Sequence, residues 1–150
     1  MGTATEQNLI NKLAGHFESL SDIKTAYGFA NNPDSLASGT LPVAIFRPIR
    51  SSLDLAAHHN IWRNDMTIDG IVCVIERQAA GGKLRNIENR AISLMQALRV
   101  KMTTESVVKD LLAVGLSRHY TFTLEYREQI NYMGIEYVGL TCQFNFSETG

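Results

Sequence analysis

The chain has 150 residues, of which 14 are Lys or Arg and 15 are Asp or Glu, giving a formal net charge of −1. This balance argues against sequence-specific nucleic acid and anionic membranes as partners, because both attract proteins with a basic excess. The hydrophobic fraction of 45% and the charged fraction of 19% are ordinary for a globular protein. We therefore expect one soluble domain over residues 1–150.

The N-terminal segment predicts an amphipathic helix over residues 5 to about 20. Thr3 and Glu6 have the spacing of a capping box at its start. The apolar residues of the segment recur at helical spacing, which predicts one buried face: Leu9, Ile10, Leu13, Phe17 and Leu20.

Two strands are expected next. Thr25–Ala30 reads as a short strand, and the polar segment 31–40 favours a loop. Leu41–Ile49 reads as the second strand, with Pro42 and Pro48 near its two ends. Because proline lacks an amide donor, these positions indicate strand ends or an edge strand.

The segment 50–60 is expected to be irregular, whereas residues 61–77 are extended and rich in β-branched side chains. Asp69-Gly70 is a dipeptide typical of hairpin turns, but it also suits a bulge in one long bent strand. We favour the bent strand, because the residues before Asp69 are polar and alternate poorly.

Helical spacing returns after the break at residues 79–82 and predicts a helix over about 83–101. A shorter helix carries the apolar residues Val107, Val108, Leu111 and Leu112, with Gly115 as its stop.

The C-terminal region has the clearest strand signal. Tyr120–Tyr126 alternates apolar with polar residues, Arg127-Glu128-Gln129 begins a turn, and Tyr137–Phe146 resumes the alternation. The chain therefore predicts an α+β fold, a mostly antiparallel sheet with helices on one face and a closing C-terminal β-hairpin. Cys73 and Cys142 lie in such alternating stretches and are expected to be buried and free, although a disulfide between adjacent strands stays open.

The sequence shows no motif of a catalytic or cofactor site. It lacks the phosphate loop, the nucleophile elbow and the paired Cys or His ligands of metal sites. His58-His59, four residues after Asp54, is the nearest approach to a metal motif, but adjacent side chains diverge and further ligands would have to come from elsewhere. We expect no enzyme activity, no cofactor and no metal, and a solvated histidine pair.

Three arginines flank this histidine loop: Arg47, Arg50 and Arg63. A basic patch there would suit an acidic partner or passing nucleic acid. Asp54 and Asp65 lie in the same region, so a mixed charged surface is the favoured interpretation.

The order of elements resembles the tail terminator proteins of long-tailed phages, the lambda tail terminator-like group. The similarity covers most of the chain, and its parts are the N-terminal helix (Leu9 to Phe17), the loop after it, the strand Leu41–Ile45, the Trp62-containing segment leading into Val72–Ile75, the helical region from Val107 to Gly115, and the closing strand Tyr137–Phe144.

This resemblance implies a structural virion protein of the tail or neck, assembled in the host cytoplasm. Six copies would form a ring that caps the tail tube and offers a face to the head-side connector, without enzyme activity or cofactor. Such a ring needs two different surfaces on each copy.

The interface residues are our own inference. We expect residues 50–63, with Arg47, Arg50, His58, His59 and Arg63, to face an axial partner. We expect the turn at 127–134, with Arg127, Glu128, Gln129 and Asn131, to meet a neighbouring subunit. Two alternatives stay open, namely another phage neck or head-completion protein, and a monomeric small-molecule-binding domain lined by the aromatic hairpin.

Overall fold

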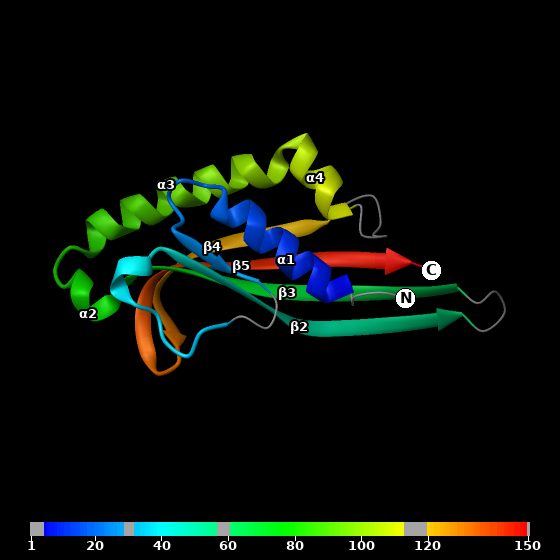
Figure 1. The fold of residues 1–150 in the computed structure, drawn as a ribbon, viewed down its shortest axis with the longest axis horizontal. Helices are drawn as coiled ribbons and strands as arrows, with labels where there is room; N and C mark the ends of the chain where they lie inside the picture. Colours follow the sequence, from blue (N-terminus) through cyan, green and yellow to red (C-terminus); the bar gives the residue numbers. More distant parts are fainter. Residues whose placement is uncertain (1–4, 29–31, 57–60, 113–119, 150) are drawn as a thin grey trace.

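Five strands form one sheet in the order β1-β2-β3-β5-β4 in a computed structural model, which describes residues 5–28, 32–56, 61–112 and 120–149 (Figure 1). Only β1 and β2 are parallel, and every other pair is antiparallel. The strands are β1 (Thr25–Tyr27), β2 (Val43–Ala56), β3 (Ile61–Glu76), β4 (Thr121–Tyr132) and β5 (Ile135–Thr149). The predicted α+β fold with a C-terminal hairpin is confirmed.

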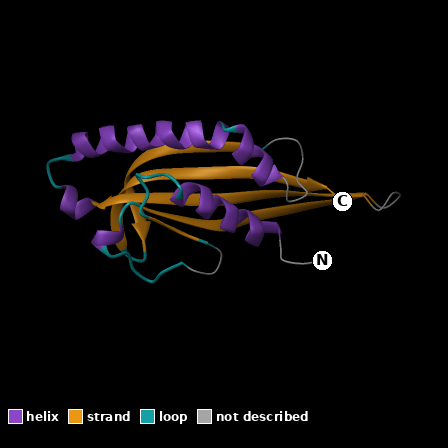
Figure 2. Cartoon of the chain, turned by 45° about the horizontal axis from the view of Figure 1, so that its top comes forward, coloured by secondary structure: helices purple, strands orange, loops and turns teal. Residues whose placement is uncertain are grey.

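The main helices lie on one face of the sheet (Figure 2). They are α1 (Thr5–Glu18), the single turn α2 (Arg77–Ala80), α3 (Leu84–Thr103) and α4 (Glu105–Leu112), with a one-turn 3₁₀ helix η1 (Ser38–Thr40) in the loop before β2. α1 packs mainly on β1 and β2, and α3 packs mainly on β4 and β5. The predicted helices are thus found, and α2 is an addition. The predicted capping residue Thr3 and the predicted stop Gly115 lie outside the described residues.

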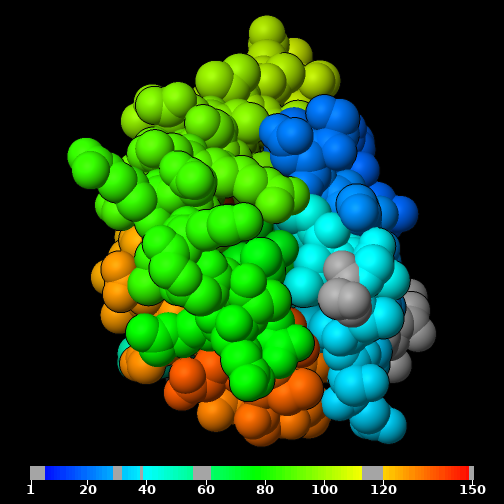
Figure 3. Space-filling view, turned by 90° about the vertical axis from the view of Figure 1, so that its left-hand side faces the viewer, coloured from blue at the N-terminus to red at the C-terminus, as the bar shows by residue number. Residues whose placement is uncertain are grey.

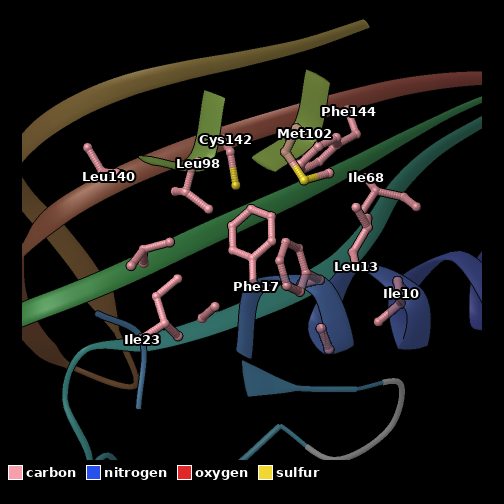
Figure 4. Close-up of a cluster of buried hydrophobic side chains, with 14 of the residues drawn as sticks. Ile10, Leu13, Phe17, Ile23, Ile68, Leu98, Met102, Leu140, Cys142 and Phe144 are labelled. Atoms are coloured by element: carbon pink, nitrogen blue, oxygen red, sulfur yellow. The ribbon is translucent and has the colours of Figure 1, made fainter. Parts of the chain in front are cut away.

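The main core lies between these helices and the sheet (Figure 4). Phe17 of α1 is fully buried and meets Phe46 of β2 edge to face, with ring centroids 4.8 Å apart. Phe144 of β5 lies beside both rings, with its centroid 6.1 Å from that of Phe17 and 6.3 Å from that of Phe46. The helical and strand periodicities in the sequence therefore converge on one apolar layer.

A smaller apolar cluster covers one end of the opposite face. It contains Leu36, Leu41, Val43, Ile45, Cys73, Ile130 and Tyr137. Figure 3 looks onto this end, where the segment 32–42 (cyan) lies beside α2 and the start of α3 (green), and the end of the β4–β5 hairpin (orange) lies below them. The Tyr132 hydroxyl donates a hydrogen bond to the Pro33 carbonyl and joins the hairpin to that segment.

The two cysteines are buried and free, as predicted. Their strands are neighbours, but Cys142 belongs to the main core and Cys73 to the small cluster on the other face. Side chains of one strand alternate between faces, so a disulfide between these two is excluded by the register. Burial raises the pKa of the Cys73 thiol to about 12 and also raises that of Cys142.

The prediction of an irregular segment at 50–60 is wrong for residues 50–56, which continue β2 and pair with β3. Pro48 is inside the strand, at a register shift before Arg50. Among the described residues, β1 pairs with β2 at residues 43–45 and no strand lies outside β2 at Pro48, so β2 is an edge strand at this point of the described sheet. The strand-end interpretation of Pro48 is therefore wrong, whereas the edge interpretation agrees with the described sheet, because an edge tolerates a residue without an amide donor.

β3 runs unbroken through Asp69-Gly70, so the long strand is confirmed and the hairpin alternative is wrong. The register shift in β3 falls later, between Cys73 and Ile75. Gly70 serves close packing, because a Cβ there would lie 2.6 Å from the Cys142 sulfur and 2.8 Å from the Phe46 ring.

The predicted turn at 127–134 is mostly wrong, since β4 continues to Tyr132 and only Met133 and Gly134 form the turn. Both turn residues have positive φ, 51° and 86°. Such values match a two-residue type I′ turn, whose handedness suits the twist of a hairpin. The extra polar residues are absorbed by a bulge between Arg127 and Ile130.

Met133→Asn should stabilise the protein, because Asn adopts positive φ more readily than Met and Met133 is 61% exposed. We expect the free energy of unfolding to rise by about 0.5 kcal/mol, measured by urea titration. A fall would show that the Met133 side chain makes a contact more important than its backbone strain.

An ion cluster joins α1 to α4. Lys12 Nζ lies 2.6 Å from Asp110 Oδ1, and His16 Nε2 lies 2.7 Å from Asp110 Oδ2. The hydrogen bond from Lys12, with a smaller contribution from His16, lowers the pKa of Asp110 below its ordinary value of 3.8.

Asp110→Asn should therefore lower the free energy of unfolding by about 0.5–1 kcal/mol at pH 7. The folded-state pKa is depressed, so this contribution is present above the ordinary pKa and is lost as the pH falls through the lowered one. Urea titrations from pH 7 down to about pH 2 should show the variant and the parent converge. Glu105→Gln, which removes an exposed pair with Lys109 on the same helix, is the control and should show a smaller difference at pH 7.

Candidate functional site

The sheet face opposite the helices is polar beyond the small cluster. Its side chains come from β3, β4 and β5, and they are hydroxyls, amides and carboxylates in register: Asp65, Thr67, Asp69, Thr121, Thr123, Glu125, Thr141, Gln143, Asn145 and Ser147. The Thr67 hydroxyl, for example, donates to the Asn145 side chain across the strands at 3.0 Å. We call this surface the open face.

The structure brings four predicted interface residues onto the open face. In the β2–β3 register, Arg47 lies opposite Asp69, and Arg50 lies opposite Thr67 after the register shift. Arg63 reaches Asp65 and Ser147 on the same face, and Arg127 pairs with Gly139 in β5. The four arginines share one face but do not form one cluster, because Arg127 is on β4, at the opposite side of the sheet from Arg47 and Arg50 on β2.

Acidic partners make this surface mixed in charge, as the sequence suggested. Arg63 Nε lies 2.9 Å from Asp65, and hydrogen bonds from Ser147 and Arg63 lower the pKa of that carboxyl. The ion pair between Arg47 and Asp69 is longer, at 3.8 Å. Burial raises the pKa of the Asp69 carboxyl, and the charge of Arg47 offsets only part of that rise. In the described part of the chain, the side chain of Arg50 has neither a hydrogen bond nor an ion pair, and Arg50 joins the sheet through its backbone alone.

The remaining predicted residues of β4 have separate places. Arg127 pairs with Glu125 at 2.9 Å. Glu128 and Gln129 form the bulge and border an open hollow of about 630 Å³ with Arg77, Glu88 and Tyr126. The Asn131 side chain accepts a hydrogen bond from the Gly134 amide at 3.2 Å, so its role is to hold the turn.

His58 and His59 lie outside the described residues. Within the ranges that the structure describes, no three His, Cys, Asp or Glu side chains are grouped to hold a metal ion. The helices in those ranges also lack the combination of length and apolar character that crossing a membrane requires.

A feature that the sequence analysis missed is the extended end of β2 and β3 (Figure 1). β4 reaches only the level of Thr67, whereas β2 and β3 continue from there to Ala56 and Ile61. We call β2 from residue 51 to 56 and β3 from 61 to 66 the arm. Leu53 and Leu55 on the arm are 59% and 69% exposed.

The arm leucines lie on the helix side of the sheet, in register with Asn64 and Trp62. Asn64 itself is buried. Its side-chain amide accepts a hydrogen bond from the Ser51 hydroxyl at 2.6 Å and donates one to the Glu148 carboxylate at 3.3 Å. The arm is therefore cross-linked at its base, but its outer leucines extend past the helices. Their alternation with Ser52 and Asp54 is a strand signal that the polar composition of the segment obscured.

Comparison with known proteins adds no identification: neither the protein-family models nor the curated proteins contain a match to this chain.

Proposed function

We propose that this chain is a structural virion protein whose copies form a ring that caps a phage tail tube and joins it to the head-side connector. The observation that carries this proposal is the arm, where two leucines are 59% and 69% exposed on a strand anchored by buried Asn64. Exposed apolar side chains that lie in one row on a strand favour contact with another protein. We take the form of this contact, a ring of six copies, from the resemblance to tail terminator proteins.

The two edges of the sheet support a ring over a symmetric dimer. One edge is β2 beyond Ile45 and the other is β4, so they differ in sequence and shape. Contacts between unlike surfaces are heterologous, and they close into a ring when the rotation between copies allows it.

The open face suits the axial partners, which are the tail tube protein and the connector or neck protein. Its hydroxyls, amides and paired charges resemble the wet, polar interfaces that form between preassembled components. Arg47 and Arg63 belong to this face, so it would serve the axial contact that we expected of them, whereas Arg50 lies on the regular part of the outer strand β2.

The test is the size and shape of the purified protein, alone and with candidate tail tubes. Light scattering should give one discrete mass, that of a ring of six copies, at all concentrations at which the ring is assembled. Electron microscopy should show rings that occupy one end of each tube. Docking on a portal adaptor instead of a tube would indicate another neck protein. A monomer at all concentrations, without docking, would contradict the proposal.

A further inference from the structure

In the described part of the sheet, each outer strand has one half with an irregular register and one half with a regular register. On β2, Pro48 and the register shift beside it disturb the edge, whereas Ser51–Ala56 is regular. On β4, the bulge after Arg127 disturbs the edge, whereas Thr121–Tyr126 is regular. Bulges and prolines are the usual means of preventing edge pairing, so their absence marks the halves that are free to pair.

The directions of the two edges are compatible. β3 is antiparallel to β2, β5 is antiparallel to β3, and β4 is antiparallel to β5. β4 is thus antiparallel to β2. A second copy that continued the same sheet would place its β4 beside β2 as an ordinary antiparallel pair.

The faces of the two edges are also compatible. Leu53 and Leu55 are on the helix side of β2, and Phe122 and Leu124 are half-buried on the helix side of β4. Arg50, Ser52 and Asp54 are on the open face, as are Thr121, Thr123 and Glu125 on the other edge. Joining the edges would extend the apolar row on one face and the polar row on the other.

We infer that β2 of one copy pairs with β4 of the next copy, with Arg50 opposite Glu125. Counting along the strands then brings Ser52 opposite Thr123 and Asp54 opposite Thr121. On the other face, Leu53 meets Phe122. This pairing rests on the proposed ring and names the surface by which its copies join.

Charge selects this register among its neighbours. A shift of one residue would turn Leu53 and Leu55 to the polar face. A shift of two residues in one direction places Arg50 opposite Arg127, and like charges directly opposite are destabilising. A shift of two residues in the other direction places Arg50 opposite the uncharged Thr123, so the arginine gains no ion pair. In the inferred register, the one open-face arginine without an ion pair in the described chain meets a carboxylate that binds Arg127 through only one oxygen, Oε2.

Cysteine cross-linking tests the pairing. In Ser52→Cys/Thr123→Cys, the new thiols of two paired copies would have Cα atoms about 4.5–5.5 Å apart, within disulfide range. Within one copy, β2 and β4 are separated by β3 and β5, a distance of about 14 Å that a disulfide does not span. Mild oxidation should give a ladder of covalent oligomers on a non-reducing gel.

Three controls use the same chemistry. Each single variant should stop at dimers at most, and Thr67→Cys/Thr123→Cys should give no ladder because Thr67 is on the inner strand β3. Arg50→Glu or Glu125→Arg alone should raise by about fivefold the protein concentration at which half of the chains are assembled. Combining the two should restore it.

The outcomes separate the pairing from the ring. Rings that form without the ladder, or without an effect of charge reversal, would overturn the inferred pairing and leave the proposed function in place. A ladder that grows without limit would confirm the pairing and contradict a closed ring. A protein that stays monomeric and does not cross-link would overturn both.

Discussion

Gly139→Ala should lower the free energy of unfolding by about 3 kcal/mol or more. A Cβ at position 139 would lie 1.8 Å from the Val72 carbonyl oxygen and 3.2 Å from the Val74 amide nitrogen. Both are backbone atoms of β3, beside the register shift between Cys73 and Ile75. No side-chain rotation relieves such a contact, so the strands β3 and β5 must separate locally.

The measurement is the midpoint of urea unfolding, with Gly15→Ala as the matched control. Gly15 lies in α1, and a Cβ there would meet no atom within 4 Å. The control should gain about 0.5–1 kcal/mol, because alanine is the better helix former. The same added methyl group should thus lower the free energy of unfolding at position 139 and raise it at position 15. A parent-like midpoint for Gly139→Ala would contradict the close approach of β3 and β5.

The elements with strong periodicity were predictable from the sequence. α1 and α3 follow from apolar residues at helical spacing, and the C-terminal hairpin follows from the alternation around Phe122 and Phe144. The apolar residues of these elements form the main core, with Phe144 buried in it and Phe122 packed against it. Burial on one face imposes the period of the element, so here the local pattern and the tertiary structure carry the same information.

The extension of β2 was not predictable, because the segment 50–56 contains only Leu53, Leu55 and Ala56 as apolar residues. Ser and Asp are poor strand formers, and pairing with β3 overrides that preference. The turn was misplaced for a similar reason. Arg127-Glu128-Gln129 has the polarity of a loop, whereas the turn residue Met133 has a side chain that rarely adopts positive φ.

The candidate site was predictable in composition but not in arrangement. Arg47, Arg50 and Arg63 were selected by their proximity in sequence, and strand register does place them on one face. The order β1-β2-β3-β5-β4 is a long-range property, so the sequence did not reveal that Arg127 lies on the opposite edge. Nor did it reveal which leucines extend past the helices.

The exposed leucines give the prediction with the largest effect on assembly. Leu53→Ser/Leu55→Ser should leave the protomer's free energy of unfolding within about 0.5 kcal/mol, because these side chains are 59% and 69% exposed. In the inferred pairing they become buried beside Phe122 of the next copy. Losing that burial should weaken each interface by about 2–4 kcal/mol, or roughly 30- to 1,000-fold in dissociation constant.

Analytical ultracentrifugation over a range of concentrations measures this loss. The control is Ile92→Ser/Val100→Ser, which removes two apolar side chains from the surface of α3 that are 39% and 67% exposed. That variant should assemble like the parent, because α3 does not form either edge of the sheet. Equal losses in the two variants would point to nonspecific hydrophobic association. Parent-like assembly of the arm variant would show that the copies join through a surface other than the leucine row of β2, since a buried Leu53 and Leu55 would leave a measurable deficit when replaced by serine.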